Sequence, residues 1–415
     1  MNGHTLNSSA AAARKATDAQ SGDICIVGNG AIGKTAALAL AQAGLRVNLL
    51  APPPSPAANA EPASWDVRVY AVNQIARDLL SSIKVWDAID AARVAAVDGM
   101  EVFGDAENHP GKLAFDAYSA HVDALAWIVE DRNLNAALDA ALKFSPNVRV
   151  TNGRAVSLRT DAQGVDLKLE NGDVLKASLL VGADGGQSWV RGQCDIGLDY
   201  RAYGQRAIVT NFACEKAHQG VAYQWFTAAE GIVALLPLPG RRVSLVWSAP
   251  DALAETLLRQ SAAQLAQHLA KYANHALGAL TPLEPELVRD FPLTLVKPHA
   301  MTAARVALIG DAAHVIHPLA GHGMNLGFAD VAALLNVIVA REPQRDCGDA
   351  RVLGRYARAR KEEVLLMQLA TDGLARLFET NMEPLRVVRN LGLNLVNHLP
   401  VLKRRLMAHA LGKRI

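Results

Sequence analysis

One stretch of the chain, residues 306–328, combines a carboxylate, several glycines and the start of an apolar helix. The apolar run 306–309 predicts a buried strand, and Gly310-Asp311 ends it with a turn that carries one carboxylate. Pro318 begins a glycine-rich loop, and residues 324–340 are apolar enough for a buried helix. The stretch therefore predicts a strand, a loop and a helix built around one acidic side chain.

The loop and the helix start supply groups that could bind an electron-rich ligand. Gly321-His322-Gly323 lets the backbone approach a ligand closely, and Asn325 opens the helix. A helix N-terminus offers unpaired N–H groups and partial positive charge, while Asp311 is a fixed acceptor. A flavin with its ribityl chain would fit. An ordinary strand–loop–helix unit explains this stretch, taken alone, about equally well, because Gly-Asp turns are common.

A second glycine motif opens the chain. Residues 24–27 predict a buried strand, residues 28–33 read Gly-Asn-Gly-Ala-Ile-Gly, a helix is expected over 34–43 and a second strand over 46–50. In a βαβ unit of this kind the first glycine (Gly28) permits the tight turn, the second (Gly30) lets a pyrophosphate approach, and the third (Gly33) allows close helix–strand packing. Because the motif follows a strand and opens a helix, dinucleotide binding is favoured over a structural turn.

The same motif lacks one expected residue. An acidic side chain should follow the second strand and hold the ribose hydroxyls, but Ala51 stands there and the next carboxylate is Glu61. The adenosine end of a dinucleotide must then be held in another way, or held less well.

Composition limits the class of protein. The chain has 415 residues, 51% hydrophobic and 20% charged, which predicts two or three structural units with a large core. A net charge of +2 implies no general affinity for nucleic acid. The four cysteines lack pairing or metal-ligand spacing and suggest a reducing, cytoplasmic compartment. Residues 1–22 lack the apolar segment of a secretory signal and are expected to form a disordered leader.

Between these motifs the pattern predicts mixed elements. A third strand end carries glycine and aspartate at residues 179–191. Asn171-Gly172 predicts a type I′ hairpin turn. The remaining expected elements are helices over 75–83, 125–142, 252–276 and after 340, paired strands at 100–104 and 113–117, short strands over 148–181, a sheet from 221–226, 232–236 and 243–247, and a return to the opening segment from 291.

Taken together, these motifs resemble the FAD-dependent aromatic hydroxylases of the para-hydroxybenzoate hydroxylase fold. Within them the chain resembles the ubiquinone-biosynthesis branch, the UbiH/UbiF/VisC or 2-polyprenyl-6-methoxyphenol hydroxylase family. The resemblance covers residues 23–412. It rests on Gly-Ala-Asp-Gly at 182–185 with Ser188 and Arg191, Gly-Asp-Ala-Ala-His at 310–314, His-Pro-Leu-Ala-Gly at 317–321 with Gly323, and Asn-Leu-Gly at 325–327.

The resemblance implies an α/β architecture in which a Rossmann-type FAD-binding domain carries an inserted antiparallel-sheet substrate domain. The FAD-binding domain would comprise 23–98, 120–200 and 295–350, the substrate domain 99–119 and 201–294, and C-terminal helices 351–415.

The resemblance also implies roles for individual residues. The loop facing the flavin would contain Pro318, Gly321, His322 and Gly323. Residues expected to bind the cofactor are Gly28, Gly30, Gly33, Arg68, Arg132, Asn135, Asp184, Asp311, Gly323, Met324 and Asn325. The substrate pocket would lie under the antiparallel sheet, near Tyr223, Trp225, Leu236, Pro237 and Trp247. Each of these five is also consistent with an ordinary sheet core.

The chemistry implied is an aromatic hydroxylation. NAD(P)H would reduce the FAD, and O₂ would form a flavin C4a-hydroperoxide that delivers one oxygen atom to a prenylated phenol of ubiquinone biosynthesis. Two alternatives stay open: a flavin oxidoreductase acting on another aromatic substrate, and a non-catalytic or weakly FAD-binding partner in a quinone-biosynthesis complex. Ala51 is the feature that favours the last alternative.

Two further features have both a functional and an ordinary interpretation. His314 and His317 lie three residues apart without a third ligand at useful spacing, so local hydrogen bonding is favoured over a base or a metal site. The basic and apolar segment 399–411 would suit peripheral contact with the inner membrane, or a helix packed on the main domain with its basic face in water.

Overall fold

A computed structural model describes residues 21–53, 64–105, 111–317 and 322–379, together with Arg389, Asn390, Asn394 and Asn397. The leader predicted over 1–22 lies almost wholly outside these residues, as do Pro318, Gly321 and the segment 399–411.

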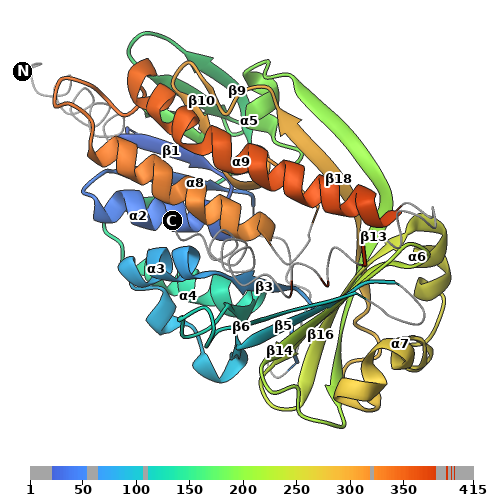
Figure 1. The fold of residues 1–415 in the computed structure, drawn as a ribbon. Helices are drawn as coiled ribbons and strands as arrows, with labels where there is room; N and C mark the ends of the chain where they lie inside the picture. The colour runs from blue at the N-terminus through green and yellow to red at the C-terminus, as the bar shows by residue number, and fades with distance from the viewer. Residues whose placement is uncertain are drawn as a thin grey trace, which may run out of the picture.

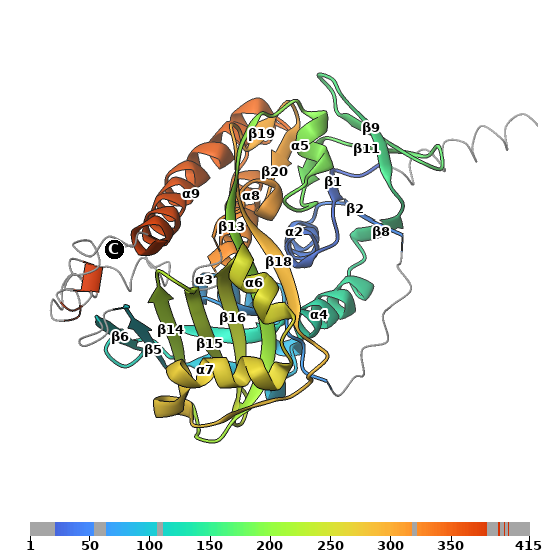
Figure 2. The same ribbon diagram turned by 90° about the vertical axis from the view of Figure 1, so that its right-hand side faces the viewer.

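Three predicted strand ends lie side by side in a six-stranded sheet of order β19-β20-β12-β1-β2-β8. Strand β1 of this sheet is labelled in Figure 1, and β19, β20, β2 and β8 are labelled in Figure 2. Val27 pairs with Gly182, and Gly182 with Leu308, in parallel register. The carboxyl ends of parallel strands mark the edge at which ligands bind. The strands are β1 Ile24–Val27, β2 Val47–Ala51, β8 Val148–Asn152, β12 Leu179–Gly182, β19 Thr302–Ala303 and β20 Val306–Leu308.

Apolar helices cover this sheet and bury its central strands. The burial pattern of β1 and β12 is continuous, as expected for strands covered on both faces. Side chains of α2 and α8 share one core with β1, β2 and β12. The helices of this part are α2 Ala31–Gln42, α3 Gln74–Ser82, α4 Asp131–Lys143, α5 Trp189–Gln193, α8 His322–Val339 and α9 Ala350–Glu379.

The second large sheet is antiparallel except for one pair of strands. Its order is β17-β13-β16-β15-β14-β5-β6, with β18 paired to β13. Helices α6 Asp251–Leu258 and α7 Ala262–Leu277 lie over one face of it (Figure 2). Its strands are β5 Gly99–Phe103, β6 Lys112–Asp116, β13 Leu198–Cys214, β14 Val221–Thr227, β15 Gly231–Leu238, β16 Arg242–Pro250, β17 Leu280–Pro282 and β18 Arg289–Pro298.

Smaller elements complete the described fold. One three-stranded sheet contains β3 Val69–Val72, β7 Ala126–Glu130 and β4 Val94–Val97, and another contains β9 Ala155–Thr160, β10 Val165–Leu169 and β11 Val174–Ala177. Short 3₁₀ turns cover Trp86–Ala88, Ala91–Arg93 and Gly310–Ala312. Among the described helices, none is long and apolar enough to cross a membrane.

The structure corrects three expected elements. The helix predicted over 125–142 begins only at Asp131, because Trp127-Ile128-Val129 pairs as β7 between β3 and β4. A strand buried on both faces shows no alternation, so its apolar run could be continued into the helical pattern. The helix predicted over 252–276 breaks before Ser261, whose side chain caps α7 in a capping box with Gln264.

The third correction concerns the hairpin between β10 and β11. A type I′ turn needs positive φ at both central residues, but of the predicted pair only Gly172 has one, at 89°. The Gly172 N–H donates to the Leu169 carbonyl and the Leu169 N–H to the Asp173 carbonyl. The loop is therefore a turn with ordinary φ at its centre, followed by a glycine bulge.

Candidate active site

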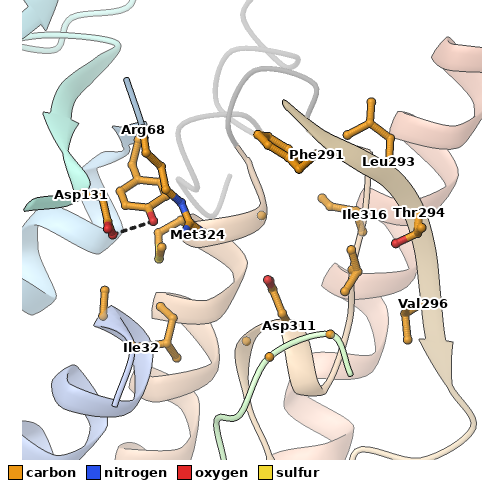
Figure 3. Close-up of a pocket in the computed structure, with 18 of the residues that line it drawn as sticks. Ile32, Arg68, Asp131, Phe291, Leu293, Thr294, Val296, Asp311, Ile316 and Met324 are labelled. Carbon is orange, nitrogen blue, oxygen red and sulfur yellow. Dashed lines mark hydrogen bonds between the residues drawn. The ribbon is translucent and has the colours of Figure 1, made fainter. Parts of the chain in front are cut away.

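A cavity of about 810 Å³ lies between the ligand-binding edge of the six-stranded sheet and the inner face of the antiparallel sheet. Figure 3 shows Asp311 at its floor, Arg68 and Met324 on one side, and Phe291, Leu293, Thr294 and Val296 of β18 on the other. Its volume lies within the range of about 300–1,000 Å³ typical of small-molecule sites. Two sheets separated in the chain therefore enclose one site.

The first glycine motif forms one wall, and its three glycines meet different surroundings. A Cβ at Gly28 would lie 2.2 Å from the Ala183 carbonyl oxygen, and one at Gly33 would lie 2.0 Å from the Gly28 oxygen. A Cβ at Gly30 would meet nothing within 4 Å, and Gly30 lines the cavity. Gly28 and Gly33 are therefore required by the fold, while Gly30 leaves backbone open to a ligand at the start of α2.

Asp311 projects into the cavity from the turn that follows β20 (Figure 3). Its carboxylate makes no hydrogen bond to another described residue. Although it stays accessible through the cavity, protein surrounds it on most sides. Burial therefore raises its pKa, an effect that the charges of His314 and Arg68 oppose. An acceptor held in this way suits a hydroxyl group of a ligand.

The wall facing Asp311 is polar. Arg68 lies over the ring of Tyr70, and the Tyr70 hydroxyl donates to Asp131 at 2.8 Å. Asn135 also donates to Asp131, at 2.8 Å, and accepts from Lys34 at 3.1 Å. Apart from Lys34, these side chains line the cavity, which brings predicted residues Arg68 and Asn135 together.

Neither Arg132 nor Asp184, both predicted to bind the cofactor, lines the cavity itself. Arg132 turns its guanidinium to Ser64 instead. One oxygen of Asp184 accepts from the Val190 N–H at 3.0 Å, and its other oxygen is buried without a hydrogen-bond partner in the described part of the chain. Asp184 thus shapes the loop whose neighbours, including Gly185, do line the cavity.

The start of α8 reaches the cavity through Gly323 and Met324. The first turn of a helix leaves N–H groups without intrahelical partners, so it offers donors to an electron-rich edge. The Asn325 side chain is used elsewhere: it accepts from the Asn73 N–H at 3.0 Å and donates to the Ala71 carbonyl at 2.7 Å. It therefore ties α8 to the β3–α3 junction.

Most of the residues predicted to form the substrate pocket lie on the sheet face that points away from this cavity. Tyr223, Trp225 and Trp247 pack into the core beneath α6 and α7, and Pro237 is absent from the cavity lining; Leu236 alone of the five does line it. Successive side chains of a strand point to opposite faces, and the large aromatic rings fill the helix-covered side. The cavity-facing residues of β14, β15 and β16 are Gln224, Ile232, Ala234, Leu236, Val246 and Ser248.

Gln224 is the residue on this face that the sequence most nearly revealed. It is a polar side chain between two aromatic residues in an apolar strand, it is buried, and its amide bonds to no described residue. Such an interruption indicates a side chain aimed at something other than the core.

His314 and His317 each form a hydrogen bond to another side chain. The His317 Nε2 lies 3.0 Å from the Gln205 Oε1, and burial lowers the pKa of His317 to about 4. The His314 Nε2 lies 2.7 Å from Asp330. In His314, burial lowers the pKa, but the charge and hydrogen bond of Asp330 outweigh it and the net shift is upward. Neither ring lines the cavity.

The residues present fit a dinucleotide that carries a flavin. The open backbone at Gly30 suits a pyrophosphate at the N-terminus of α2. The unpartnered carboxylate of Asp311 suits a polyol, and the first turn of α8 suits an electron-rich ring. The acidic residue missing at position 51 has no replacement in β2, where Ala51 is buried.

Comparisons with known proteins agree with this fit. Residues 21–367 match the family model described as an FAD binding domain. The chain is 37% identical over 396 residues to 3-demethoxyubiquinol 3-hydroxylase of Escherichia coli, covering 94% of this chain and 98% of the relative. It is 36% identical to the ubiquinone hydroxylase UbiL of Rhodospirillum rubrum, covering 94% and 89%. The chain belongs to the FAD-binding family of flavin-dependent monooxygenases, in the group that contains the ubiquinone-biosynthesis hydroxylases.

Solved structures confirm the fold. The p-nitrophenol 4-monooxygenase PnpA of Pseudomonas putida superposes with a TM-score of 0.74 at 18% identity, covering 95% of this chain and all of that one. PqsL of Pseudomonas aeruginosa, in complex with 2-aminobenzoylacetate, gives 0.73 at 21% identity, covering 90% and 100%. The predicted para-hydroxybenzoate hydroxylase-like fold, with an FAD-binding Rossmann-type sheet and an inserted antiparallel sheet, is therefore correct.

Proposed function

We propose that this monooxygenase inserts one oxygen atom from O₂ into the ring of a prenylated phenol of ubiquinone biosynthesis, with NAD(P)H as the reductant. The names of two relatives that match nearly the whole chain support this substrate class, because they are a demethoxyubiquinol hydroxylase and a ubiquinone hydroxylase. The single structural observation that carries the proposal is the cavity itself, where the polar, cofactor-suited edge faces a mostly apolar sheet surface.

Each wall of the cavity has a separate task in this proposal. Reduced FAD supplies the activation of O₂ when it is bound. Asp311 would hold a cofactor hydroxyl, Gly30 and the start of α2 the pyrophosphate, and the first turn of α8 the electron-rich edge. Arg68 places a positive charge beside the same space.

The sheet face would bind and orient the phenol. Ile232, Ala234, Leu236 and Val246 give an apolar surface that excludes water. Gln224 and Ser248 add amide and hydroxyl groups that can hydrogen-bond to ring oxygens of the substrate. The described cavity residues on β13 to β18 contain no aspartate, glutamate, histidine, lysine or arginine, so this face binds through shape and neutral hydrogen bonds.

Isotopically labelled O₂ tests the reaction. Purified enzyme is supplied with FAD, NAD(P)H and a short-chain prenylated methoxyphenol, and the product is analysed by mass spectrometry. A hydroxylated phenol carrying the label supports the proposal. NAD(P)H oxidation that yields only hydrogen peroxide, with the phenol unchanged, would contradict the substrate assignment.

A prenylated substrate also implies that the enzyme works beside lipid. We infer peripheral contact with the cytoplasmic side of the inner membrane, directly or within a quinone-biosynthesis complex. Co-sedimentation with anionic liposomes, compared with and without residues 399–415, tests direct contact. Equal recovery of the two forms would assign the contact to other parts or to a complex.

A further inference from the structure

Three ionisable side chains meet behind the turn that carries Asp311, and all three are buried. Asp330 of α8 is 0% exposed, His314 1% and Arg360 of α9 2%. The two carboxylate oxygens of Asp330 are used separately: one lies 2.7 Å from the His314 Nε2, and the other accepts from the Arg360 Nε at 2.7 Å. Helices α8 and α9 are thus joined through one carboxylate.

Asp330 also holds the backbone of the turn itself. The Gly310 N–H donates to the same Asp330 oxygen that faces His314, at 2.9 Å. Gly310 has φ of +59°, a left-handed conformation that glycine adopts readily. Because Asp311 is the next residue, the direction in which its side chain leaves the turn depends on how Gly310 is held.

Helix α9 contacts the same region through two more hydrogen bonds. The Arg360 guanidinium donates to the Leu326 carbonyl at 3.3 Å, and the Tyr356 hydroxyl donates to the Leu308 carbonyl at 2.8 Å. Leu308 is the last residue of β20, and Leu326 lies near the start of α8. The strand end, the turn and the helix start are therefore fixed relative to one another from behind the cavity.

Stability alone does not explain why these ionisable side chains are buried together. Well-packed apolar side chains of similar volume often stabilise a protein as much as a buried ion pair, or more. Burial alone would raise the pKa of the Asp330 carboxyl, but His314 and Arg360 outweigh it, so the pKa lies below its ordinary value and the group is ionised. A charged acceptor at this place fixes the direction of the Gly310 N–H through a hydrogen bond, which an apolar residue could not form.

We propose that Asp330 is a positioning residue for FAD binding. It fixes the Gly310-Asp311 turn so that the Asp311 carboxylate points into the cavity, and its contacts with His314 and Arg360 hold the Asp330 carboxylate in place. Asp330 itself does not line the cavity. The inference depends on FAD being the cofactor and is independent of which phenol the enzyme hydroxylates.

A double-mutant cycle on FAD affinity distinguishes positioning from a general structural role. Apoprotein of the wild type, Asp311→Asn, Asp330→Asn and the double variant is titrated with FAD, and binding is followed by quenching of flavin fluorescence. Loss of a charge-assisted hydrogen bond predicts weakening of about 10- to 100-fold in each single variant. If Asp330 acts through Asp311, the double variant binds no more than about threefold more weakly than Asp311→Asn.

The outcomes are separable even if one variant is unstable. The proposal would be overturned if the fold losses of FAD affinity in the two single variants multiplied in the double variant. It would also be overturned if Asp330→Asn bound FAD as tightly as the wild type. Circular dichroism checks that each apoprotein is folded. If Asp330→Asn does not fold, His314→Gln with Asp311→Asn completes the same cycle and is read in the same way. Asp349→Asn is the matched control, because Asp349 pairs with Arg345 between α8 and α9 and does not reach the turn; its FAD affinity should equal that of the wild type.

Discussion

At the scale of single residues, Asp311 is expected to favour FAD binding while it lowers the stability of the empty protein. Its pKa is raised in the folded apoprotein, chiefly by burial, so folding favours its protonated form. Such a group stabilises the fold most below its unfolded pKa, and that contribution is lost as pH rises through the folded pKa. At neutral pH, where the carboxylate is ionised, Asp311 therefore lowers the stability of the empty protein and remains available to bind its ligand.

Asp311→Asn should consequently bind FAD more weakly and yet leave an apoprotein that melts at an equal or higher temperature at pH 7. Acidification should weaken FAD binding in the wild type, beginning above the pH at which an ordinary aspartate protonates, and the variant should lack this dependence. Differential scanning calorimetry and FAD titration from pH 4 to pH 7 measure both effects. A clear fall in the melting temperature of the apo variant would contradict this account of Asp311.

The glycine motif yields a matched pair of substitutions. Gly33→Ala places a Cβ 2.0 Å from the Gly28 oxygen, whereas Gly30→Ala places one in open space. We expect Gly30→Ala to fold like the wild type and bind FAD more weakly, because the methyl group enters the space open to the pyrophosphate. Gly33→Ala should lower expression and melting temperature. Normal FAD affinity in folded Gly30→Ala would show that the pyrophosphate does not bind beside Gly30.

At the scale of elements, strand β14 shows which features of the sheet could be predicted from the sequence and which could not. Its strand character and its neighbours β15 and β16 follow from apolar runs and turns, and they were predicted correctly. Which face meets the cavity depends on where α6 and α7 pack, and in β14 the polar Gln224 is the local sign of it. The large rings of Tyr223 and Trp225 therefore drew the prediction to the helix-covered face.

Neighbouring residues of β14 provide the corresponding prediction. Gln224→Leu should change the KM for the phenol while FAD affinity and melting temperature stay close to wild type. Trp225→Ala should lower the free energy of unfolding by about 3–5 kcal/mol, as expected for a large ring removed from a core, with a nearly unchanged KM in the folded enzyme. Steady-state kinetics and urea unfolding measure the two. The reverse assignment of effects would show that the cavity faces the other side.

The exposed edge of the antiparallel sheet has its own protection. The Gly111, Lys112 and Ala114 N–H groups donate to the side-chain oxygens of Asn390, Asn394 and Asn397 respectively. Uncovered strand edges invite pairing with another chain. The C-terminal asparagines thus occupy edge groups of β6 that could otherwise pair. Sequence alone does not reveal this, because the two segments lie about 280 residues apart.

Replacement of these three asparagines by alanine should promote concentration-dependent self-association and lower the melting temperature. Each lost hydrogen bond contributes about 0.5–1.5 kcal/mol. Analytical ultracentrifugation measures the association, and Asn171→Ala, in an exposed hairpin turn, is the control. A triple variant that sediments and melts like the wild type would show that these contacts are dispensable.

At the scale of the whole molecule, the site exists because three distant strand ends share one sheet edge. That meeting was predictable, since parallel strands end at a common edge and each carries glycine or aspartate there. The support behind it was not, because Arg360 lies in a charge-rich stretch of α9 and nothing in the sequence shows that it pairs with Asp330 of α8. A cofactor bound between the two sheets should also stabilise both, by a free energy that grows with the logarithm of its concentration over its dissociation constant.

The decisive experiment is a structure of the enzyme with FAD and a phenolic ligand bound. We expect the pyrophosphate beside Gly30, a ribityl hydroxyl on the Asp311 carboxylate, the flavin edge at the first turn of α8, and the phenol ring against Gln224 and Ser248. A flavin whose ribityl chain avoids Asp311, or a phenol bound on the face of Trp225 and Trp247, would contradict it.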